Sequence, residues 1–283
     1  MQNITQDNLV SDVLMKQYSD LVYSRTGIRL SEQKKILLSN RVRRRLRATG
    51  IASFEAYFAH LKKLSPSEEE WDRFLQEITT HETYLFRDEM HWKWFRQTFL
   101  PERAAAARKD PKAKNLRIWS AAASTGDEAF TVATCIAATI PNVSQWKIEI
   151  VGTDIGIGAL EEAREGTFNE NAMRLVPDDL RSRYFTKAPG VHVWKAKPAL
   201  GEMITFRQHN LMDSLNERPF DLVLVKNVLI YFDSKSKQQV LSRVLPLVKP
   251  GAYFVAGAAE GVSDFMQDLE RIQPWLYQKP LKG

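Results

Sequence analysis

The chain has 283 residues, a formal net charge of +6 and an isoelectric point near 9.3. Hydrophobic residues make up 44% of it and charged residues 26%, which is usual for folded globular proteins and excludes disordered and fibrous ones. No apolar run reaches the roughly 18–20 residues that a membrane span needs, and the polar start is unlike a signal peptide. We therefore expect a cytoplasmic protein that does not insert into the membrane.

The cysteine and histidine content argues against redox and metal chemistry. The single cysteine, Cys135, cannot form an internal disulfide and lies in an apolar helical stretch, where a packed thiol is expected. The five histidines lack the paired helical spacing of a zinc site, so no metal ligand is predicted. The basic charge points to an acidic partner, which could be a nucleic acid, a membrane surface or a protein.

Residues 1–76 are predicted to form a helical domain, because apolar positions recur at helical spacing from residue 9 onward. Within this domain Gly27 and Gly50 are typical of helix ends. Residues 77–116 contain a tryptophan-rich helix and an alanine-rich run, and we expect them to connect the helical domain to the rest of the chain.

One predicted helix of this domain is strongly basic. Its apolar face consists of Leu38, Val42 and Leu46, which recur every four residues. Cations without interleaved acidic residues occupy the other side and the positions just before the helix: Lys34, Lys35, Arg41, Arg44 and Arg45. From the residues alone, a solvated surface helix and a docking surface for an acidic partner are about equally good interpretations.

Between residues 117 and 283 short β-rich runs alternate with helical ones, which predicts an α/β fold with a parallel sheet. The β-rich runs are RIWSAA, WKIEIVGTDI, MITFRQHN, FDLVLVKN and AYFVAGAAE. Residues 186–206 interrupt the alternation with Pro and Gly around the run VHVW, so we expect a small antiparallel insertion there.

Three loops at the carboxyl ends of these strands are candidates for a ligand site, because open α/β sheets bind ligands there. The loop at 120–130 holds small residues and Gly126, which let a ligand approach the backbone closely. Asp154 ends the second strand, where an acid can accept both hydroxyls of a ribose or cap the next helix; the nearby glycine loop favours the ribose. Lys226 and Asn227 end an apolar strand, where a polar pair is costly to bury without a partner.

In their order and spacing, five segments resemble the CheR family of chemotaxis-receptor methyltransferases: ITTHETYLFRD, RIWSAAASTGDEAF, VGTDIGIGALEEAREGTF, FDLVLVKNVLIYFD and LPLVKPGAYFVAGAAE. The resemblance covers nearly the whole chain. It implies a Rossmann-like core that binds S-adenosylmethionine and releases S-adenosylhomocysteine, an all-helical N-terminal domain and a small antiparallel β-subdomain. It also implies methylation of glutamate side chains on the cytoplasmic helices of methyl-accepting chemotaxis receptors, for sensory adaptation.

By this resemblance the cofactor contacts fall at His81, Thr83, Arg87, Glu128, Asp154, Asn210, Leu211, Lys226 and Asn227. His81 and Lys226 depart from the usual Asn and Arg, and the usual His-Ser is missing before Glu260. Arg87 and Tyr231 are the candidate catalytic residues near the acceptor and the methyl group. The resemblance assigns the basic helix to receptor docking. The insertion shows no obvious glycine-containing tether loop, so we expect a member that binds no receptor tether.

Two other functions compete with this one. A nucleic-acid methyltransferase is disfavoured, because no Asn/Asp-Pro-Pro-aromatic motif follows the fourth strand and Cys135 is misplaced for methylation at carbon; we expect no nucleic-acid partner. A non-catalytic docking module that binds S-adenosylmethionine is motivated by His81 and Lys226. Retention of the residues implied for methyl transfer argues against it. We expect a monomer.

Overall fold

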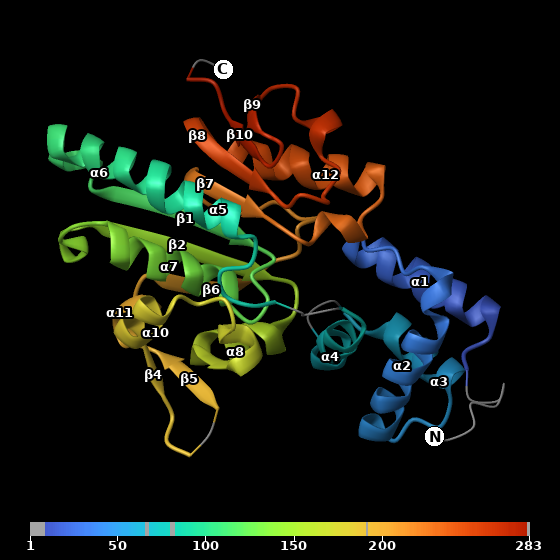
Figure 1. The fold of residues 1–283 in the computed structure, drawn as a ribbon. Coiled ribbons are helices and arrows are strands. Elements are labelled where there is room, and N and C mark those ends of the chain that lie inside the picture. The colour runs from blue at the N-terminus through green and yellow to red at the C-terminus, as the bar shows by residue number, and fades with distance from the viewer. Residues whose placement is uncertain (1–8, 66–67, 80–82, 191, 282–283) are drawn as a thin grey trace.

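The structure is a computed structural model of the chain, and it describes residues 9–65, 68–79, 83–190 and 192–281. It contains a helical domain, a seven-stranded sheet with helices packed on both faces, and a separate three-stranded sheet (Figure 1). The fold class is thus the predicted one. Among the described residues no helix has the length and apolar character needed to cross a membrane.

The helical domain begins the described chain, and its first two helices end where the sequence predicts. Ser11 and Ser53 accept backbone amides at the starts of the first and third helices, and such a cap contributes about 1 kcal/mol. Gly27 and Gly50 are the predicted ends of the first two helices, and the structure shows both in the left-handed conformation. The α-helices of this domain are α1 (Asp12–Thr26), α2 (Lys35–Thr49), α3 (Phe54–Lys63) and α4 (Glu69–Ile78).

Aromatic side chains from three of these helices form the centre of the domain's own core. Tyr18, Tyr57 and Phe74 are fully buried, and the rings of both tyrosines contact that of Phe74. Leu38 and Val42 of α2 are buried in the same cluster, which confirms the predicted apolar face of that helix. Each fully buried aliphatic or phenylalanine side chain contributes about 1.5–3 kcal/mol to this packing.

A long helical segment follows the helical domain in the chain. It runs through α5 (Glu89–Trp94), a π-helical turn (Phe95–Phe99) and α6 (Leu100–Lys109). Trp92 and Leu100 on this segment are buried in the core of the large sheet, so the segment packs as an outer layer on one face of that sheet (Figure 1).

The large sheet has the strand order β6-β2-β1-β7-β8-β10-β9. Its five parallel strands correspond to the predicted ones: β1 (Asn115–Ala121), β2 (Lys147–Asp154), β6 (Ile204–Gln208), β7 (Phe220–Val225) and β8 (Val248–Ala256). The antiparallel strands β9 (Glu270–Gln273) and β10 (Leu276–Gln278) were not predicted. All four residues of β9 are exposed, so it carries no alternating apolar pattern.

Alternating side chains of the central strands supply the cores on the two faces of the sheet. Ile118 and Leu222 lie on the face covered by the α5–α6 segment and α7, whereas Trp119 and Val223 lie on the face covered by α12. The helices that follow the strands are α7 (Asp127–Thr139), α8 (Ile157–Glu165) and α12 (Ser234–Val244). All five parallel strands therefore present their carboxyl ends at one edge of the sheet.

The small sheet differs in extent from the predicted insertion at 186–206. Its strand order is β3-β5-β4, with β3 (Thr167–Asn169), β4 (Phe185–Lys187) and β5 (Val193–Ala196). The strand β3 therefore lies before the predicted range, while Ile204–Gln208 belongs to the large sheet. A three-residue strand is too short to show a period, which explains the difference. Short helices flank the small sheet: α9 (Glu170–Met173), α10 (Asp178–Tyr184) and α11 (Pro198–Gly201).

Candidate active site

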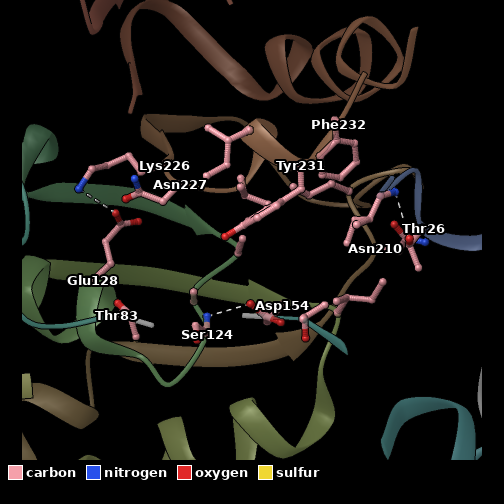
Figure 2. Close-up of a pocket in the computed structure, with 18 of the residues that line it drawn as sticks. Thr26, Thr83, Ser124, Glu128, Asp154, Asn210, Lys226, Asn227, Tyr231 and Phe232 are labelled. Carbon is pink, nitrogen blue, oxygen red and sulfur yellow. Dashed lines mark hydrogen bonds and ion pairs between the residues drawn. The ribbon is translucent and has the colours of Figure 1, made fainter. Parts of the chain in front are cut away.

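A pocket lies at the carboxyl ends of the parallel strands, where the helical domain meets the large sheet (Figure 2). Its walls come from the loops after β1, β2, β6 and β7, from the segment before α5, and from residues of the helical domain. His81 lies outside the described residues. The structure brings every other predicted cofactor and catalytic residue to this pocket: Thr83, Arg87, Glu128, Asp154, Asn210, Leu211, Lys226, Asn227 and Tyr231.

The loop between β1 and α7 exposes its backbone to the pocket. Ala122, Ser124 and Gly126 have positive φ values of 60°, 50° and 89°, and the two non-glycine residues cost about 1–2 kcal/mol each in that conformation. A Cβ atom on Gly126 would lie 3.0 Å from that of Ala163, so a glycine is needed for close packing against α8. Costly backbone conformations of this kind concentrate at ligand sites.

Hydrogen bonds from two loops fix the side chain of Asp154: the loop after β1 and the loop after β2, which follows Asp154 itself. Its side chain is buried, with one carboxylate oxygen accepting the amide of Ser124 at 2.8 Å and the other that of Gly156 at 2.9 Å. A carboxylate has about four acceptor positions, so two are left for a pair of hydroxyls in the pocket. The alternative role as helix cap is filled elsewhere, since the first amide of α8, Ile157, is bound by Asp72 at 2.9 Å. These contacts support the ribose interpretation.

Lys226 forms a buried ionic cluster in the pocket wall. Its ammonium lies 3.1 Å from a carboxylate oxygen of Asp88 and 3.3 Å from one of Glu128, and its side chain is only 3% exposed. It also donates to the backbone carbonyl of Arg87 at 3.4 Å and lies over the ring of Trp92. Two carboxylates and one backbone carbonyl of the protein therefore surround the ammonium. Lys226 thus holds the segment that carries Arg87.

The loop after β7 is fixed by a carboxylate beneath it. Glu260 is fully buried and accepts the amides of Asn227 and Ile230, the latter at 3.1 Å. Asn227 has a positive φ of 58°, which these bonds help to maintain. Burial raises the pKa of Glu260, while the amide donors of the loop lower it and favour the charged form. Asn227 therefore reaches the pocket from a rigid turn.

Tyr231 projects its side chain into the pocket from a turn of 3₁₀ helix (Figure 2). The backbone around it is tied to the helical domain, because the amide of Arg29 donates to the Tyr231 carbonyl at 3.1 Å and Ile28 forms a β-bridge with Phe232. Lys34 also lines the pocket, with its ammonium 5.5 Å from the centre of the Tyr231 ring. The helical domain thus forms one wall of the site.

Arg87 borders the pocket from the segment that precedes α5. Its guanidinium is 5.6 Å from the centre of the Tyr84 ring, and Thr83 lines the same pocket. The indole of Trp92 donates to the Arg87 carbonyl at 2.6 Å. The backbone of Arg87 is therefore held in place while its side chain borders the pocket.

Asn210 and Leu211 line the pocket from the loop after β6. The amide group of Asn210 donates to the carbonyl of Arg25 at 2.8 Å and accepts the amide of Met212 at 3.0 Å. Leu211 is buried in the core of the sheet face that α12 covers. The side chain of Asn210 thus joins the end of α1 to the sheet, in addition to bordering the pocket.

Acidic residues from another helix neutralise part of the positive charge of the predicted docking helix α2. Arg45 makes two hydrogen bonds to Glu70 of α4, at 3.0 and 2.6 Å, and its side chain is 11% exposed. Arg44 pairs with Glu77 of α4 at 3.0 Å but is 63% exposed. No acid is interleaved in the basic run itself, but the tertiary structure supplies two from α4. Arg45 is a structural residue of the helical domain.

The other predicted docking residues also have defined surroundings. Lys35 pairs with Asp12 at 2.6 Å, and Arg41 donates to the carbonyl of Ile78 at 2.7 Å. Lys34 lies at the pocket, as described above. Of the predicted set, Arg44 therefore offers the most exposed guanidinium.

Two residues that matter for the site were not singled out by the sequence pattern. Glu260 gives a detectable signal, because it is a carboxylate just after an apolar strand, as Lys226 and Asn227 are polar residues just after another. Asp72 gives none, because it is one of several acids in the first turn of α4, where acids are common.

Comparisons with known proteins give the same family for both domains. Residues 81–275 match the family described as CheR methyltransferase, SAM binding domain, and residues 15–79 match CheR methyltransferase, all-alpha domain.

Whole-length relatives carry one functional description. The chain is 33% identical over 266 residues to a chemotaxis protein methyltransferase of Escherichia coli (strain K12). The alignment covers 92% of this chain and 88% of that protein. It is 31% identical over 280 residues to the chemotaxis protein methyltransferase of Borreliella burgdorferi, with 98% and 95% covered. It is also 33% identical over 250 residues to chemotaxis protein methyltransferase 2 of Pseudomonas aeruginosa, with 87% and 85% covered.

Proposed function

Because the chain belongs to the CheR family of S-adenosylmethionine-dependent methyltransferases, we propose that it methylates glutamate side chains on the cytoplasmic helices of chemotaxis receptors. The products would be glutamyl methyl esters and S-adenosylhomocysteine, and the role would be sensory adaptation. Since those helices lie in the cytoplasm, the enzyme would act there, as a monomer.

The observation that carries the proposal is the composition of the pocket. Asp154 presents a fixed carboxylate with two acceptor positions left, which suits the hydroxyls of a ribose. The small-residue loop after β1 adds a backbone that a ligand can approach closely. Arg87 and Tyr231 line the same cavity. Together these residues fit an adenosyl cofactor at one end and a small anionic acceptor beside it.

The proposed chemistry demands little acid or base catalysis. S-adenosylmethionine supplies a methyl group carried on a positively charged sulfur. A glutamate side chain has an ordinary pKa near 4.3, so at neutral pH it is already a carboxylate nucleophile. Correct positioning of two such reactants can lower a barrier by roughly 7–11 kcal/mol. The enzyme's contribution would therefore be to hold the acceptor in line and to exclude water.

In this proposal Arg87 and Tyr231 handle the acceptor. The guanidinium of Arg87 can bind a carboxylate through two parallel hydrogen bonds, which fixes its orientation. The hydroxyl of Tyr231 can donate to one carboxylate oxygen while the other attacks. Neutralisation of opposite charges in the transition state is favoured in a site of low water content. Arg44 would contribute to docking of an acidic receptor helix outside the pocket.

The first prediction concerns Arg87. The enzyme is incubated with receptor-containing membranes and with S-adenosylmethionine that carries a labelled methyl group. The base-labile label released as methanol is then counted. Wild-type enzyme should give such label on a receptor-sized band, and Arg87→Ala should lower kcat/KM about 10- to 100-fold, the effect of losing a charged hydrogen-bond pair worth about 1.5–3 kcal/mol.

The matched control replaces a second arginine that contacts the ring of Tyr84. Arg174 lies 3.4 Å from the centre of the Tyr84 ring but does not line the pocket, so Arg174→Ala should keep nearly full activity. Base-stable label would point to nitrogen or carbon acceptors and contradict the proposal. Binding of the cofactor and receptor without any transfer would establish a docking module instead.

A further inference from the structure

The helical domain reaches the cofactor side of the molecule through helix α4. This helix packs against α8, which follows the strand that ends in Asp154 (Figure 1). At the contact the side chain of Asp72 is buried, and one of its oxygens accepts the amide of Ile157 at 2.9 Å. Asp72 precedes Ile157 by 85 residues, so the contact is between domains.

Helix α8 depends on this outside acceptor, because its own cap residue supplies none. The cap is Gly156, which has no side chain to accept the first amides of the helix. Asp72 takes this role from the other domain. The neighbouring Gln76 lies so close to Gly158 that a Cβ atom there would be 2.2 Å from the Gln76 side-chain oxygen. Gly158 thus leaves room for the Gln76 side chain of α4 to pack directly on the backbone of α8.

Asp154 uses the adjacent amide of the same turn. Its carboxylate accepts the amide of Gly156 at 2.9 Å, while Asp72 accepts that of Ile157. Two carboxylates thus share the consecutive donors at the start of α8. Burial raises the pKa of Asp72, and its hydrogen bonds to the amides of Ile157 and Gly158 lower it, so these donors favour its charged form.

We propose that Asp72 is a positioning residue for the cofactor site, through which the helical domain fixes the orientation of Asp154. Without Asp72 the amides at the start of α8 lack an acceptor in the protein. Asp154 is the nearest carboxylate to them in the chain, so it would turn toward the helix and away from a ribose. The helical domain would therefore serve cofactor binding as well as docking, independently of which acceptor is methylated.

The test measures binding of S-adenosylhomocysteine to the full chain by calorimetry, without any methyl transfer. Asp72→Ala should weaken binding about 5- to 10-fold, in line with the roughly 1 kcal/mol that a helix cap contributes. Asp72→Asn keeps a side-chain oxygen that can accept the same amide, so its affinity should stay within about twofold of wild type. Faster hydrogen exchange at Ile157 in Asp72→Ala would report the lost cap directly.

Glu77→Ala is the matched control, because it removes a carboxylate from the same helix whose partner, Arg44, lies within the helical domain. It should bind S-adenosylhomocysteine as wild type does. The proposal is overturned if Asp72→Ala binds normally, if Glu77→Ala is equally weak, or if Asp72→Asn fails to restore affinity. If Asp72→Ala does not fold, Asp72→Ser replaces it, since its shorter side chain cannot reach the amide and the same loss is expected.

Discussion

Lys226 stands between two carboxylates and is almost wholly removed from solvent. Desolvating a charge is costly, and the cost is offset here by Asp88, Glu128 and the carbonyl of Arg87. The family resemblance implies an arginine at this position, where the chain has a lysine. The surroundings accept either cation, because both carboxylates lie within reach and Arg offers more donors.

Removing the charge of Lys226 should therefore destabilise the protein more than replacing this lysine with arginine. Lys226→Met is expected to lower the free energy of unfolding by about 2–3 kcal/mol, somewhat less than the ~3–5 kcal/mol for a wholly buried pair, because Asp88 is partly exposed. Lys226→Arg should stay within about 1 kcal/mol of wild type. Urea unfolding at neutral pH measures both.

Lys235→Met, at an exposed position of α12, is the control for loss of a lysine charge and should change stability by less than about 0.5 kcal/mol. An unchanged unfolding curve for Lys226→Met would mean that the ionic cluster contributes nothing to stability.

At the scale of the elements, helix α2 carries a structural arginine and an exposed arginine at neighbouring positions. Arg45 lies against Glu70, which also accepts the hydroxyl of Tyr57 at 2.6 Å. Burial and these contacts make the pair part of the domain core. Arg44 is mostly in solvent, where an ion pair contributes about 0–1 kcal/mol and is screened by salt.

Neighbouring substitutions in α2 should therefore give opposite results. Arg45→Ala is expected to destabilise the protein by about 2 kcal/mol, because it leaves Glu70 poorly solvated without its cation. Arg44→Ala should change stability by less than about 0.5 kcal/mol but weaken binding of a receptor cytoplasmic fragment about 3- to 10-fold at low salt. Urea unfolding and fragment titration at two salt concentrations separate the effects; equal behaviour of both variants would refute the distinction.

At the scale of the whole molecule, segments far apart in the chain meet around buried groups. His91 of α5 is buried, and its ring centre lies 4.3 Å from that of Trp275, beside the C-terminal strands. Burial, and after it the charge of Lys226, lowers the pKa of His91 to about 4, although Asp88 acts in the opposite direction. The imidazole is therefore neutral in the folded protein at neutral pH.

This burial predicts a loss of stability in weak acid. The unfolded chain, with a histidine pKa near 6.5, binds more protons than the folded one between pH 6.5 and about 4, so stability falls as the pH falls through that window. The loss between pH 7 and 5 should be about 2 kcal/mol by urea unfolding. His91→Phe keeps an aromatic ring against Trp275 and should flatten this part of the profile; an unaltered slope would assign the loss to other groups.

The sequence by itself determined the features that depend on a few neighbouring residues, namely the parallel strands and the ends of helices. Short β-rich runs located the five parallel strands, and glycines located the ends of α1 and α2. Since parallel strands end at one edge, the strand pattern alone predicts that Asp154, Lys226 and Asn227 share a single site. The fully exposed strand β9 and the three-residue strand β3 have no such pattern, and neither was predicted.

Only the tertiary structure decided which charges meet across the chain. The acids that face Arg44 and Arg45 come from α4, and the cap of α8 comes from Asp72 in another domain. Lys226 was predicted as a cofactor contact, and its ammonium lies beside Asp88, Glu128 and the carbonyl of Arg87. Such pairs depend on how complete helices and sheets pack together, which short-range periodicity does not specify, because the free energy of each contact arises only when both elements are in place.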